Sequence, residues 1–409
     1  MNKKDSIAVV PKYRFPEFAL DASIDYVAGG FLFDPITNRN HHADLPILAI
    51  TQEYGAIPRD EIDYKVSVTK KSLKAYKIVE KGDFIISLRS FQGGIEYSMY
   101  DGICSPAYII LRKKTNIIDQ YYKYYFKSHR FIQDLNKDLE GIRDGKMISY
   151  GQFSSILLPK PDEEEQQKIV DCLSSIDDLI SVEEKKLSLL NDYKKGWMQK
   201  LFPAEGKTVP EWRFPEFKDD NNWKCVEIET VGKVITGKTP PTSNDSLWNG
   251  SIQFVTPTDI VGDKYQRLVQ RTVVKTSNMK VLPKGTIMFT CIASVGKMAI
   301  SVYPCVTNQQ INSIITKKGY YNEFIYYSLF RNVNKIKSGL SNTTVPIINK
   351  TNFSKIQISV TLNEKEQQKI ANFLSGIDDL ISTQADRIEA LKQHKKALMQ
   401  GLFPAVEEV

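Results

Sequence analysis

One segment of the chain matches the pattern of a phosphate-binding loop. The eight residues from Gly232 to Thr239 satisfy GxxxxGK[ST], a loop that normally opens a helix whose first amides hold a phosphate. Here Pro240 and Pro241 follow and lead into the turn-rich sequence TSNDS, so no amphipathic helix is expected. We therefore expect no ATP site, although an ATP-dependent enzyme built on Lys238 and Thr239 is one alternative.

Other residues that could do chemistry lack the partners their reactions need. Adenine methyltransferases carry an [DNS]PP[YFW] motif, but the paired prolines here lie in TPPTS. The acids between Asp162 and Lys168 begin a predicted helix, so they are interpreted as capping groups rather than as a nuclease site. The four histidines and five cysteines show no metal-ligand spacing. We expect no catalytic residue, no metal site and no cofactor in this chain.

Forty residues near the middle of the chain recur near its end. Residues 165–204 and 366–405 align without a gap, and 22 of the 40 positions are identical. A shorter motif repeats out of phase with them, since VPKYRFPEF at 10–18 returns as VPEWRFPEF at 209–217. The order of motif, block and repeat thus occurs twice. Two dissimilar blocks held in one framework are expected to make two different contacts through one geometry.

Each repeat is predicted to be a long helix. In both copies an Asp or Asn cap precedes a Glu by three residues, and the Glu is expected to reach back to the cap amide. These pairs are Asp162–Glu165 and Asn363–Glu366. Apolar residues recur at steps of four and three, as in a coiled-coil seam, and about 40 residues at 1.5 Å each make a rod roughly 60 Å long. The predicted seam consists of Ile169, Leu173, Ile176, Ile180, Leu187, Leu190, Trp197 and Leu201 with Ile370, Leu374, Ile377, Ile381, Ile388, Leu391, Leu398 and Leu402.

Connectivity predicts how the two helices pair. If the second block is compact and its ends are close together, the second helix starts beside the end of the first and runs back along it. The pair is then antiparallel. By the repeat symmetry, the motif at 10–18 is expected to lie against the end of the second helix, which closes the chain into a pseudo-circle with an approximate two-fold axis. A helical hairpin that braces an ordinary two-domain protein is the alternative.

The blocks between the repeats have a mixed α and β pattern. Stretches rich in β-branched and aromatic residues alternate with Gly, Pro and Asn turns. A Tyr-rich helical stretch follows in each block, at 121–126 and 324–330, and is interpreted as core. The predicted class is α+β, with two α/β domains joined by a long antiparallel two-helix coiled coil. The predicted parts are 1–160 (first domain with its motif), 161–204 (first spacer helix), 205–361 (second domain) and 362–409 (second spacer helix and tail).

Charge is unevenly distributed along a chain whose net charge is +7. Residues 205–361 hold 20 Lys and Arg against 11 Asp and Glu, whereas residues 161–204 hold 6 against 10. This pattern favours phosphate-binding surface on the blocks, although many soluble enzymes are mildly basic too. No run of 18 apolar residues and no signal peptide is present, so we expect a cytoplasmic protein without a membrane partner.

The combination of these features resembles a known family. Helices with EQQKI near the start, IDDL in the middle and LFPA at the end, each following a variable block, resemble the specificity subunit of a type I restriction–modification system. The blocks agree, because residues 78–111, 237–260 and 282–315 resemble the target-recognition domains of that family. The resemblance covers nearly the whole chain.

This resemblance implies a non-catalytic subunit that directs other subunits to double-stranded DNA. Each recognition domain would read one half of a bipartite, asymmetric target, and the helices would set the gap, with half-sites roughly one helical turn apart. The helices would also hold two modification subunits, which bring S-adenosylmethionine and methylate adenine. Restriction subunits that use ATP and Mg²⁺ to translocate and cut DNA would join the larger complex. A coiled-coil scaffold with two protein-binding heads is the alternative.

Within this resemblance, the residues that read bases can be chosen by chemistry. Arg, Lys, Asn and Gln suit bidentate bonds to base edges in the major groove, and Ser and Thr are adaptable partners. Loops that place such residues beside glycines are the candidates, while a turn, cap or phosphate role is equally open for each residue. The first block offers Gln52, Tyr54, Arg89, Ser90, Gln92, Arg143 and Lys146. The second block offers Lys238, Thr239, Ser294, Lys297, Asn308, Gln309, Asn342 and Thr343.

Overall fold

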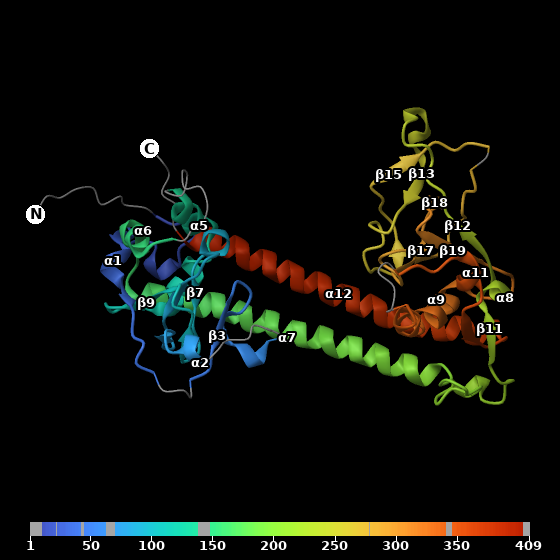
Figure 1. The fold of residues 1–409 in the computed structure, drawn as a ribbon, viewed down its shortest axis with the longest axis horizontal. Coiled ribbons are helices and arrows are strands. Elements are labelled where there is room, and N and C mark those ends of the chain that lie inside the picture. The colour runs from blue at the N-terminus through green and yellow to red at the C-terminus, as the bar shows by residue number, and fades with distance from the viewer. Residues whose placement is uncertain are drawn as a thin grey trace, which may run out of the picture. The chain divides into compact units, whose positions relative to one another are not determined.

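Two compact units make up the chain, one comprising 1–183 with 387–409 and the other 184–386. The computed structural model describes residues 10–21, 23–41, 45–62, 70–137, 148–277, 279–340 and 346–403. The two repeats form the long helices α7 (Glu163–Leu201) and α12 (Glu364–Leu402), each of 39 residues, as predicted (Figure 1). Each unit therefore contains one block, the start of one long helix and the end of the other.

A four-stranded antiparallel sheet forms the centre of the first unit. The strands of this unit are β1 (Asp25–Ala28), β2 (Phe33–Ile36), β3 (Leu48–Thr51), β4 (Gly55–Pro58), β5 (Lys77–Val79), β6 (Phe84–Ile86), β7 (Glu96–Tyr97), β8 (Gly102–Cys104), β9 (Ile109–Lys113) and β10 (Leu157–Lys160). The short helices are η1 (Pro16–Phe18), α1 (Gly29–Leu32), η2 (Arg59–Glu61), α2 (Lys70–Leu73), α3 (Ser90–Gly93), α4 (Asp119–Tyr125), α5 (His129–Asn136) and α6 (Tyr150–Ser155). The central sheet has the order β2-β9-β6-β7, and the pairs β1-β10, β3-β4 and β5-β8 form separate ladders.

The second unit repeats this framework and adds to it. Its strands are β11 (Lys224–Glu227), β12 (Gly232–Thr236), β13 (Trp248–Val255), β14 (Tyr265–Gln266), β15 (Arg271–Val273), β16 (Ile287–Thr290), β17 (Met298–Ser301), β18 (Cys305–Thr307), β19 (Ile311–Thr316) and β20 (Gln357–Val360). The short helices are η4 (Pro215–Phe217), α8 (Ile228–Val231), η5 (Asp245–Leu247), α9 (Asn322–Phe330), α10 (Val333–Ser338) and α11 (Lys350–Ser354). The sheet order β12-β19-β16-β17-β14 contains the order of the first unit, and β11-β20 matches β1-β10.

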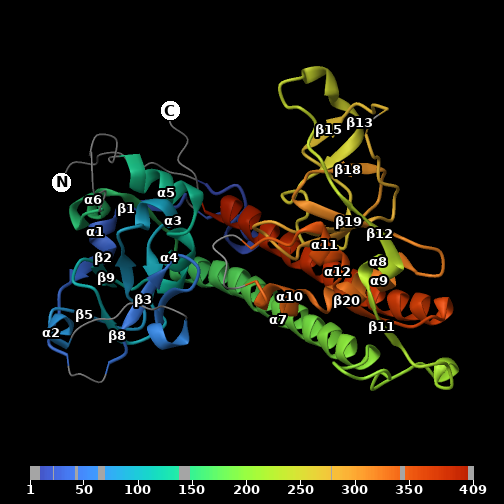
Figure 2. The same cartoon turned by 45° about the vertical axis from the view of Figure 1, so that its right-hand side comes forward.

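The two blocks differ in what is attached to the shared sheet. In the second block, β13 joins β15 and β18 in a separate three-stranded sheet, which lies on the side away from α9 and α12 (Figures 1 and 2). The first block has the hairpin β3-β4 and the ladder β5-β8 instead. The mixed α and β content and the two-domain repeat that the sequence predicts are therefore present.

Each hydrophobic core includes the ends of the long helices. In the first unit, the ring of Phe403 lies 5.4 Å from Tyr121 and 5.5 Å from Tyr125. In the second unit, Phe202 lies 5.4 Å from Trp223 and 5.5 Å from Phe324. Apart from Phe330, which is exposed, the aromatic residues of the Tyr-rich stretches are buried in these cores, which confirms their interpretation as core. Within the described part of the chain, no helix has both the length and the apolar character that a membrane crossing needs.

Candidate functional site

An arginine from each repeated motif is buried against the start of a long helix. Arg14 donates two hydrogen bonds to the carboxylate of Glu165, both of 2.8 Å. Arg213 donates the equivalent pair to Glu366, of 2.7 and 2.8 Å, and these two side chains are 7% and 0% exposed. The hydrogen bond to Glu366 raises the pKa of Arg213, although burial opposes the rise. Each motif is therefore fixed to the start of a long helix by a bidentate, charge-assisted pair of hydrogen bonds.

These glutamates correct one prediction from the sequence. Glu366 does not reach back to the cap amide, because the amide of Asn363 donates to the hydroxyl of Thr361 instead. Asn363 caps its helix through its own side chain, which accepts a bond of 2.9 Å from the amide of Lys365. A carboxylate gains more from a bidentate bond with a guanidinium than from a single neutral amide, and this preference overrides the capping pattern.

The same motifs also touch the end of the other long helix. The amide of Tyr13 donates to the carbonyl of Gly401 at 2.8 Å, and the amide of Trp212 donates to that of Lys200 at 3.0 Å. A Cβ on Gly401 would lie 1.9 Å from the Tyr13 ring, so glycine leaves room for the ring in this position. The N-terminal motif therefore lies against the end of the second helix, where the repeat symmetry predicted it.

A half-buried aspartate links both long helices to the block within each unit. In the first unit, Asp177 accepts hydrogen bonds from Tyr124 at 2.8 Å and from Lys395 at 2.5 Å. The second unit has the same contact between Asp378, Tyr327 and Lys194. In the first unit Glu183 also pairs with Arg387 at 2.9 Å. From Asp177 to Glu183 the residue number on α7 rises, while that of the α12 partner falls from Lys395 to Arg387. The two helices are antiparallel there.

The predicted seam residues are all buried or half-buried. Some of them belong to the cores of the blocks: Leu173 and Leu402 pack in the first core, and Leu374 and Leu201 pack in the second. The spacing of four and three therefore reflects packing against the blocks as well as between helices.

Four exposed candidates of the first block, Gln52, Tyr54, Arg89 and Gln92, lie on two neighbouring segments. The side chain of Gln52 donates to the carbonyl of Arg89 at 3.3 Å, which joins the turn after β3 to the loop that carries Arg89 and Gln92. A Cβ on Gly93 would lie 2.6 Å from the Gln52 side chain, so glycine allows this contact. Tyr54 projects from the same turn and is 59% exposed.

The remaining candidates of the first block have other surroundings. Ser90 is 1% exposed, and its hydroxyl accepts a bond of 2.8 Å from the amide of Ser87, so it is committed to the turn. Arg143 and Lys146 lie outside the described residues.

In the second block, the loop after β12 contacts the loop after β18. The hydroxyl of Thr239 donates to the side chain of Gln309 at 2.7 Å, and Lys238 and Gln309 are exposed. A cavity of about 390 Å³ opens beside Lys238, and Lys280 and Thr307 also line it. These loops therefore form a polar, positively charged edge with a recess behind it.

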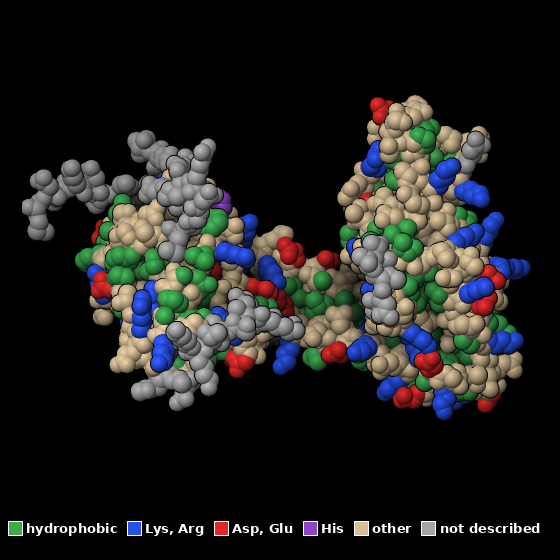
Figure 3. Space-filling view, viewed as in Figure 1, with side chains coloured by type: hydrophobic (Ala, Val, Ile, Leu, Met, Phe, Trp, Pro, Cys, Tyr) green, Lys and Arg blue, Asp and Glu red, His purple; other side chains and the backbone are tan. Residues whose placement is uncertain are grey.

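The other candidates of the second block are more dispersed. Ser294 and Lys297 are exposed on the turn between β16 and β17. Asn308 is 8% exposed, and its side chain bonds with Gln310 within the turn. Asn342 and Thr343 lie outside the described residues. On the face in view, Lys and Arg side chains are spread over this block, consistent with its positive balance (Figure 3).

The phosphate-loop match does not have the geometry of a phosphate site. Residues Gly232–Thr236 are strand β12 rather than a loop. The amides of Gly237 and Lys238 donate to the carbonyls of Ile311 and Thr307, at 3.1 and 2.8 Å, so they are not available to an anion. The chain then passes through an irregular stretch to the three-residue helix η5, which is too short to provide an anion-binding N-terminus.

One buried group was not predicted from the sequence. Lys264, just before β14, is 8% exposed, and its ammonium lies 3.1 Å from Glu323 and 2.5 Å from the hydroxyl of Ser375. Burial favours a higher pKa for Glu323, but hydrogen bonds from Tyr265 and Ser375 and the charge of Lys264 lower it below its usual value. Nothing in the local sequence marks Lys264, because its partners are far away in the chain.

Comparisons with known proteins identify the family. The profile "Type I restriction modification DNA specificity domain" matches residues 34–192 and 220–393. The MjaIX type I restriction enzyme specificity subunit of Methanocaldococcus jannaschii is 32% identical over 46% of this chain and 46% of its own length. The putative MjaX specificity subunit of the same organism is 27% identical over 84% of this chain and 82% of its own length.

The fold comparison agrees with these relatives. The S subunit of a type I restriction–modification system from M. genitalium superposes with a TM-score of 0.58, at 14% identity, over 97% of this chain and 100% of that chain. At this identity the likeness concerns the fold alone. The family match covers most of the chain and includes both blocks. The chain therefore belongs to the type I restriction–modification DNA specificity family, whose members are targeting subunits rather than catalytic ones.

Proposed function

We propose that this chain reads a bipartite, asymmetric double-stranded DNA target, with one half-site for each block. The observation that carries the proposal is the shared sheet order of the two blocks together with their different attachments. The central strands keep one order, whereas the hairpin β3-β4 of one block is replaced by the sheet of β13, β15 and β18 in the other. One framework with two sets of loops is suited to two different half-sites held in related orientations.

We infer that the long helices act as the spacer between the half-sites. Antiparallel pairing, the buried seam and the motifs that join the end of one helix to the start of the other support a coiled coil in a pseudo-circular chain with an approximate two-fold axis. In this arrangement the parts are 1–160, 161–204, 205–361 and 362–409, as the repeats suggest. The centres of the two half-sites are then expected to lie roughly one turn of DNA apart, about 10 base pairs.

The exposed candidates are proposed to contact DNA. Gln52, Arg89 and Gln92 are suited to base edges because their amide and guanidinium groups can form paired hydrogen bonds. Lys238 and Lys297 carry charges on flexible stems and are suited to phosphate. Gln309, Tyr54, Thr239 and Ser294 complete the accessible set. The buried Ser90 and Asn308 are left out of it.

Two modification subunits are proposed to dock on the helices. Seven identical positions of the two repeats are exposed in both copies, and three of them lie near one another: Asp178, Leu179 and Lys396, with the counterparts Asp379, Leu380 and Lys195. Asp177 pairs with Lys395, so in the first unit Asp178 and Lys396 each follow a partner of that ion pair. Exposed residues kept at the same place in both copies suit one partner bound twice, with Leu179 or Leu380 as the apolar contact.

The chemistry is proposed to belong to those partners. Modification subunits would supply S-adenosylmethionine and methylate adenine, and restriction subunits would use ATP and Mg²⁺ in the larger complex. This chain would bind no cofactor itself. Because its ligand is DNA, we propose that it acts in the cytoplasm.

A methylome measurement tests this function. The chain is expressed with its modification subunit in a host that has no DNA methylation, and methylated adenines are mapped by single-molecule sequencing. We expect a split adenine-methylated motif that is absent when the modification subunit is expressed alone. A stable, active complex that produced no such motif would contradict the proposal.

A further inference from the structure

Lys264 carries a buried charge at the edge of the second block. The residue lies directly before β14, which is the edge strand of the five-stranded sheet. Its carbonyl accepts a bond of 2.7 Å from the amide of Ile300, so its backbone is part of the block. Its side chain is 5% exposed, a degree of burial that lysine rarely reaches without a charged partner.

The partners of this ammonium come from two other elements. Glu323 and Tyr327, on α9, lie 3.1 and 3.3 Å from the Lys264 nitrogen, and Ser375, on α12, lies 2.5 Å from it. Glu323 also accepts bonds from Ser375 at 2.9 Å and from Tyr265 at 2.5 Å. One buried ion pair therefore connects the edge strand, α9 and α12.

The network continues to the other long helix. Tyr327 donates to Asp378 on α12, which pairs with Lys194 on α7, both at 2.5 Å. The edge of the block is thus connected to both helices through side chains that are largely shielded from water, where such bonds are strong and geometrically specific.

The first unit repeats the contact between the tyrosine and the aspartate, but not the contacts that Lys264 makes with Glu323 and Ser375. Tyr124 and Asp177 repeat the contact of Tyr327 with Asp378. Ser174, which aligns with Ser375, donates instead to the carbonyl of Asp171 in its own helix, at 3.3 Å. Gln120 stands four residues before Tyr124, where the second block has Glu323 before Tyr327. The added ion pair distinguishes how the second block is attached to its helix.

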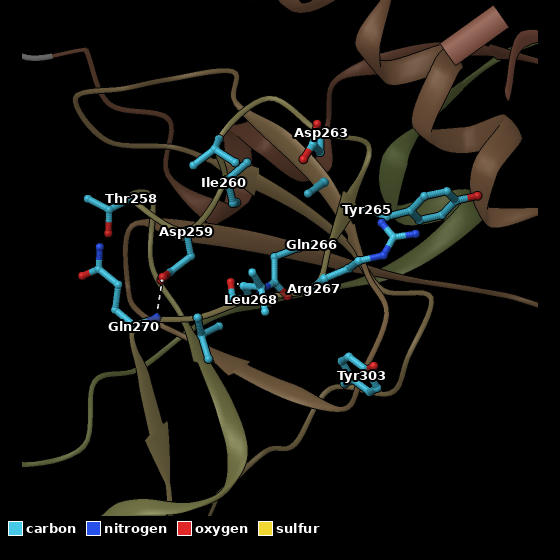
Figure 4. A pocket seen from close by; sticks show the side chains of 13 residues that line it. Thr258, Asp259, Ile260, Asp263, Tyr265, Gln266, Arg267, Leu268, Gln270 and Tyr303 are labelled. Carbon is cyan, nitrogen blue, oxygen red and sulfur yellow. Dashed lines mark hydrogen bonds between the residues drawn. The ribbon is translucent and has the colours of Figure 1, made fainter. Parts of the chain in front are cut away.

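The segment that follows Lys264 faces outward and borders a cavity. Residues 258–261, 263 and 265–270, with Ala299 and Tyr303, line a space of about 660 Å³. Figure 4 shows the side chains of Tyr265 and Arg267 beside it, close to each other, and Tyr303 on another edge. Lys264 thus anchors the base of this outward-facing segment to the helices.

We propose that Lys264 is a positioning residue: its ion pair with Glu323 fixes the second block on α12 and so determines which gap length goes with the second half-site. This inference rests on the proposed function. Successive base pairs are 3.4 Å apart along DNA, so a shift of about that size at the reading loops changes the preferred gap by one base pair. Without the ion pair, the block is held by apolar packing, by the Tyr327 contact and by the bonds of Gln367 with Tyr321 and Gly319, which leave the edge at Lys264 less restricted than a buried charged network does.

The test compares four variants in the methylome assay, using targets whose gap is shortened or lengthened by one base pair. Lys264→Met removes the ammonium, and Lys264→Met with Glu323→Gln removes both charges. Ser375→Ala keeps both charges and removes only the hydrogen bonds of the serine hydroxyl. Lys317→Met is the matched control, because the Lys317 side chain bonds carbonyls of Glu229 and Thr230 within the block itself. Thermal unfolding and co-purification with the modification subunit establish that each variant is folded and assembled.

We expect the two Lys264 variants to methylate the altered gaps at least tenfold more, relative to the native gap, than the wild type does. Both half-site sequences should stay unchanged, Ser375→Ala should show a smaller effect, and the control should behave as the wild type. Gap discrimination within twofold of the wild type in the charge-free double variant would overturn the inference. If Lys264→Met does not fold, gap discrimination in the double variant and in Ser375→Ala tests the inference. A wild type without any bipartite motif would instead contradict the proposed function.

Discussion

Removing Arg213 tests the contact that fixes each motif to a long helix. Arg213→Met leaves the carboxylate of Glu366 buried, with the hydroxyl of Thr361 at 2.6 Å as a remaining hydrogen-bond donor. Breaking a buried ion pair by removing one partner costs about 3–5 kcal/mol, because the other charge stays uncompensated. The double variant Arg213→Met with Glu366→Met has no buried charge, and the Thr361 hydroxyl and the carbonyls of Asp220 and Asn221 each lose a hydrogen-bond partner. We expect it to lie within about 2 kcal/mol of the wild type.

Tryptophan fluorescence gives this experiment a selective probe. The four tryptophans are Trp197, Trp212, Trp223 and Trp248, and all lie in the unit that contains Arg213. Urea unfolding of the full chain, followed by fluorescence, should therefore report that unit, with the midpoint and slope giving the change in free energy. Arg14→Met is the matched control, because it breaks the same contact in the unit without tryptophan. A cost below about 1 kcal/mol for Arg213→Met, or equal costs for the single and double variants, would refute the reasoning.

Three further predictions follow from particular contacts. Leu179→Asp combined with Leu380→Asp should weaken binding of the modification subunit at least tenfold in calorimetry without lowering the melting temperature, and unchanged affinity would argue against this docking surface. Lys238→Ala should reduce the slope of log K against log salt by about 1 in fluorescence anisotropy with target DNA if the side chain binds a phosphate, and an unchanged slope would exclude that role. Because the pKa of Glu323 is lowered in the folded chain, its stabilising effect is present above its unfolded pKa of about 4.3 and is lost as the pH falls through the folded pKa. Glu323→Gln should therefore flatten the loss of stability below about pH 4 in urea titrations, and a pH profile identical to the wild type would contradict this.

The long helices and the position of the N-terminal motif could be predicted because local sequence patterns and the repeats indicate them. The 22 identities between the repeats, the caps and the apolar spacing indicate α7 and α12, and the position of the N-terminal motif follows from phasing alone. The contact between Tyr13 and Gly401 confirms that position. Strands rich in β-branched residues were recognised for the same reason, since their preference is local.

The site was harder to predict because its contacts join distant parts of the chain. Arg213 meets Glu366 across 153 residues, and a capping pattern at the helix start suggested a different role for the glutamate. Lys264 looks like an ordinary surface lysine until the fold brings Glu323 and Ser375 to it. Ser90 is a plausible base reader by type, but its turn uses the hydroxyl. Tertiary structure overrides residue type in each of these cases.

The most direct test of the proposal that each block reads one half-site is to exchange one block. Residues 205–361 are replaced by the corresponding block of another member of the family, and the methylome of the hybrid is compared with that of the parent chain. The account predicts that one half-site changes, while the other half-site stays as it was. A hybrid that assembles and methylates but changes both half-sites, or neither, would contradict it.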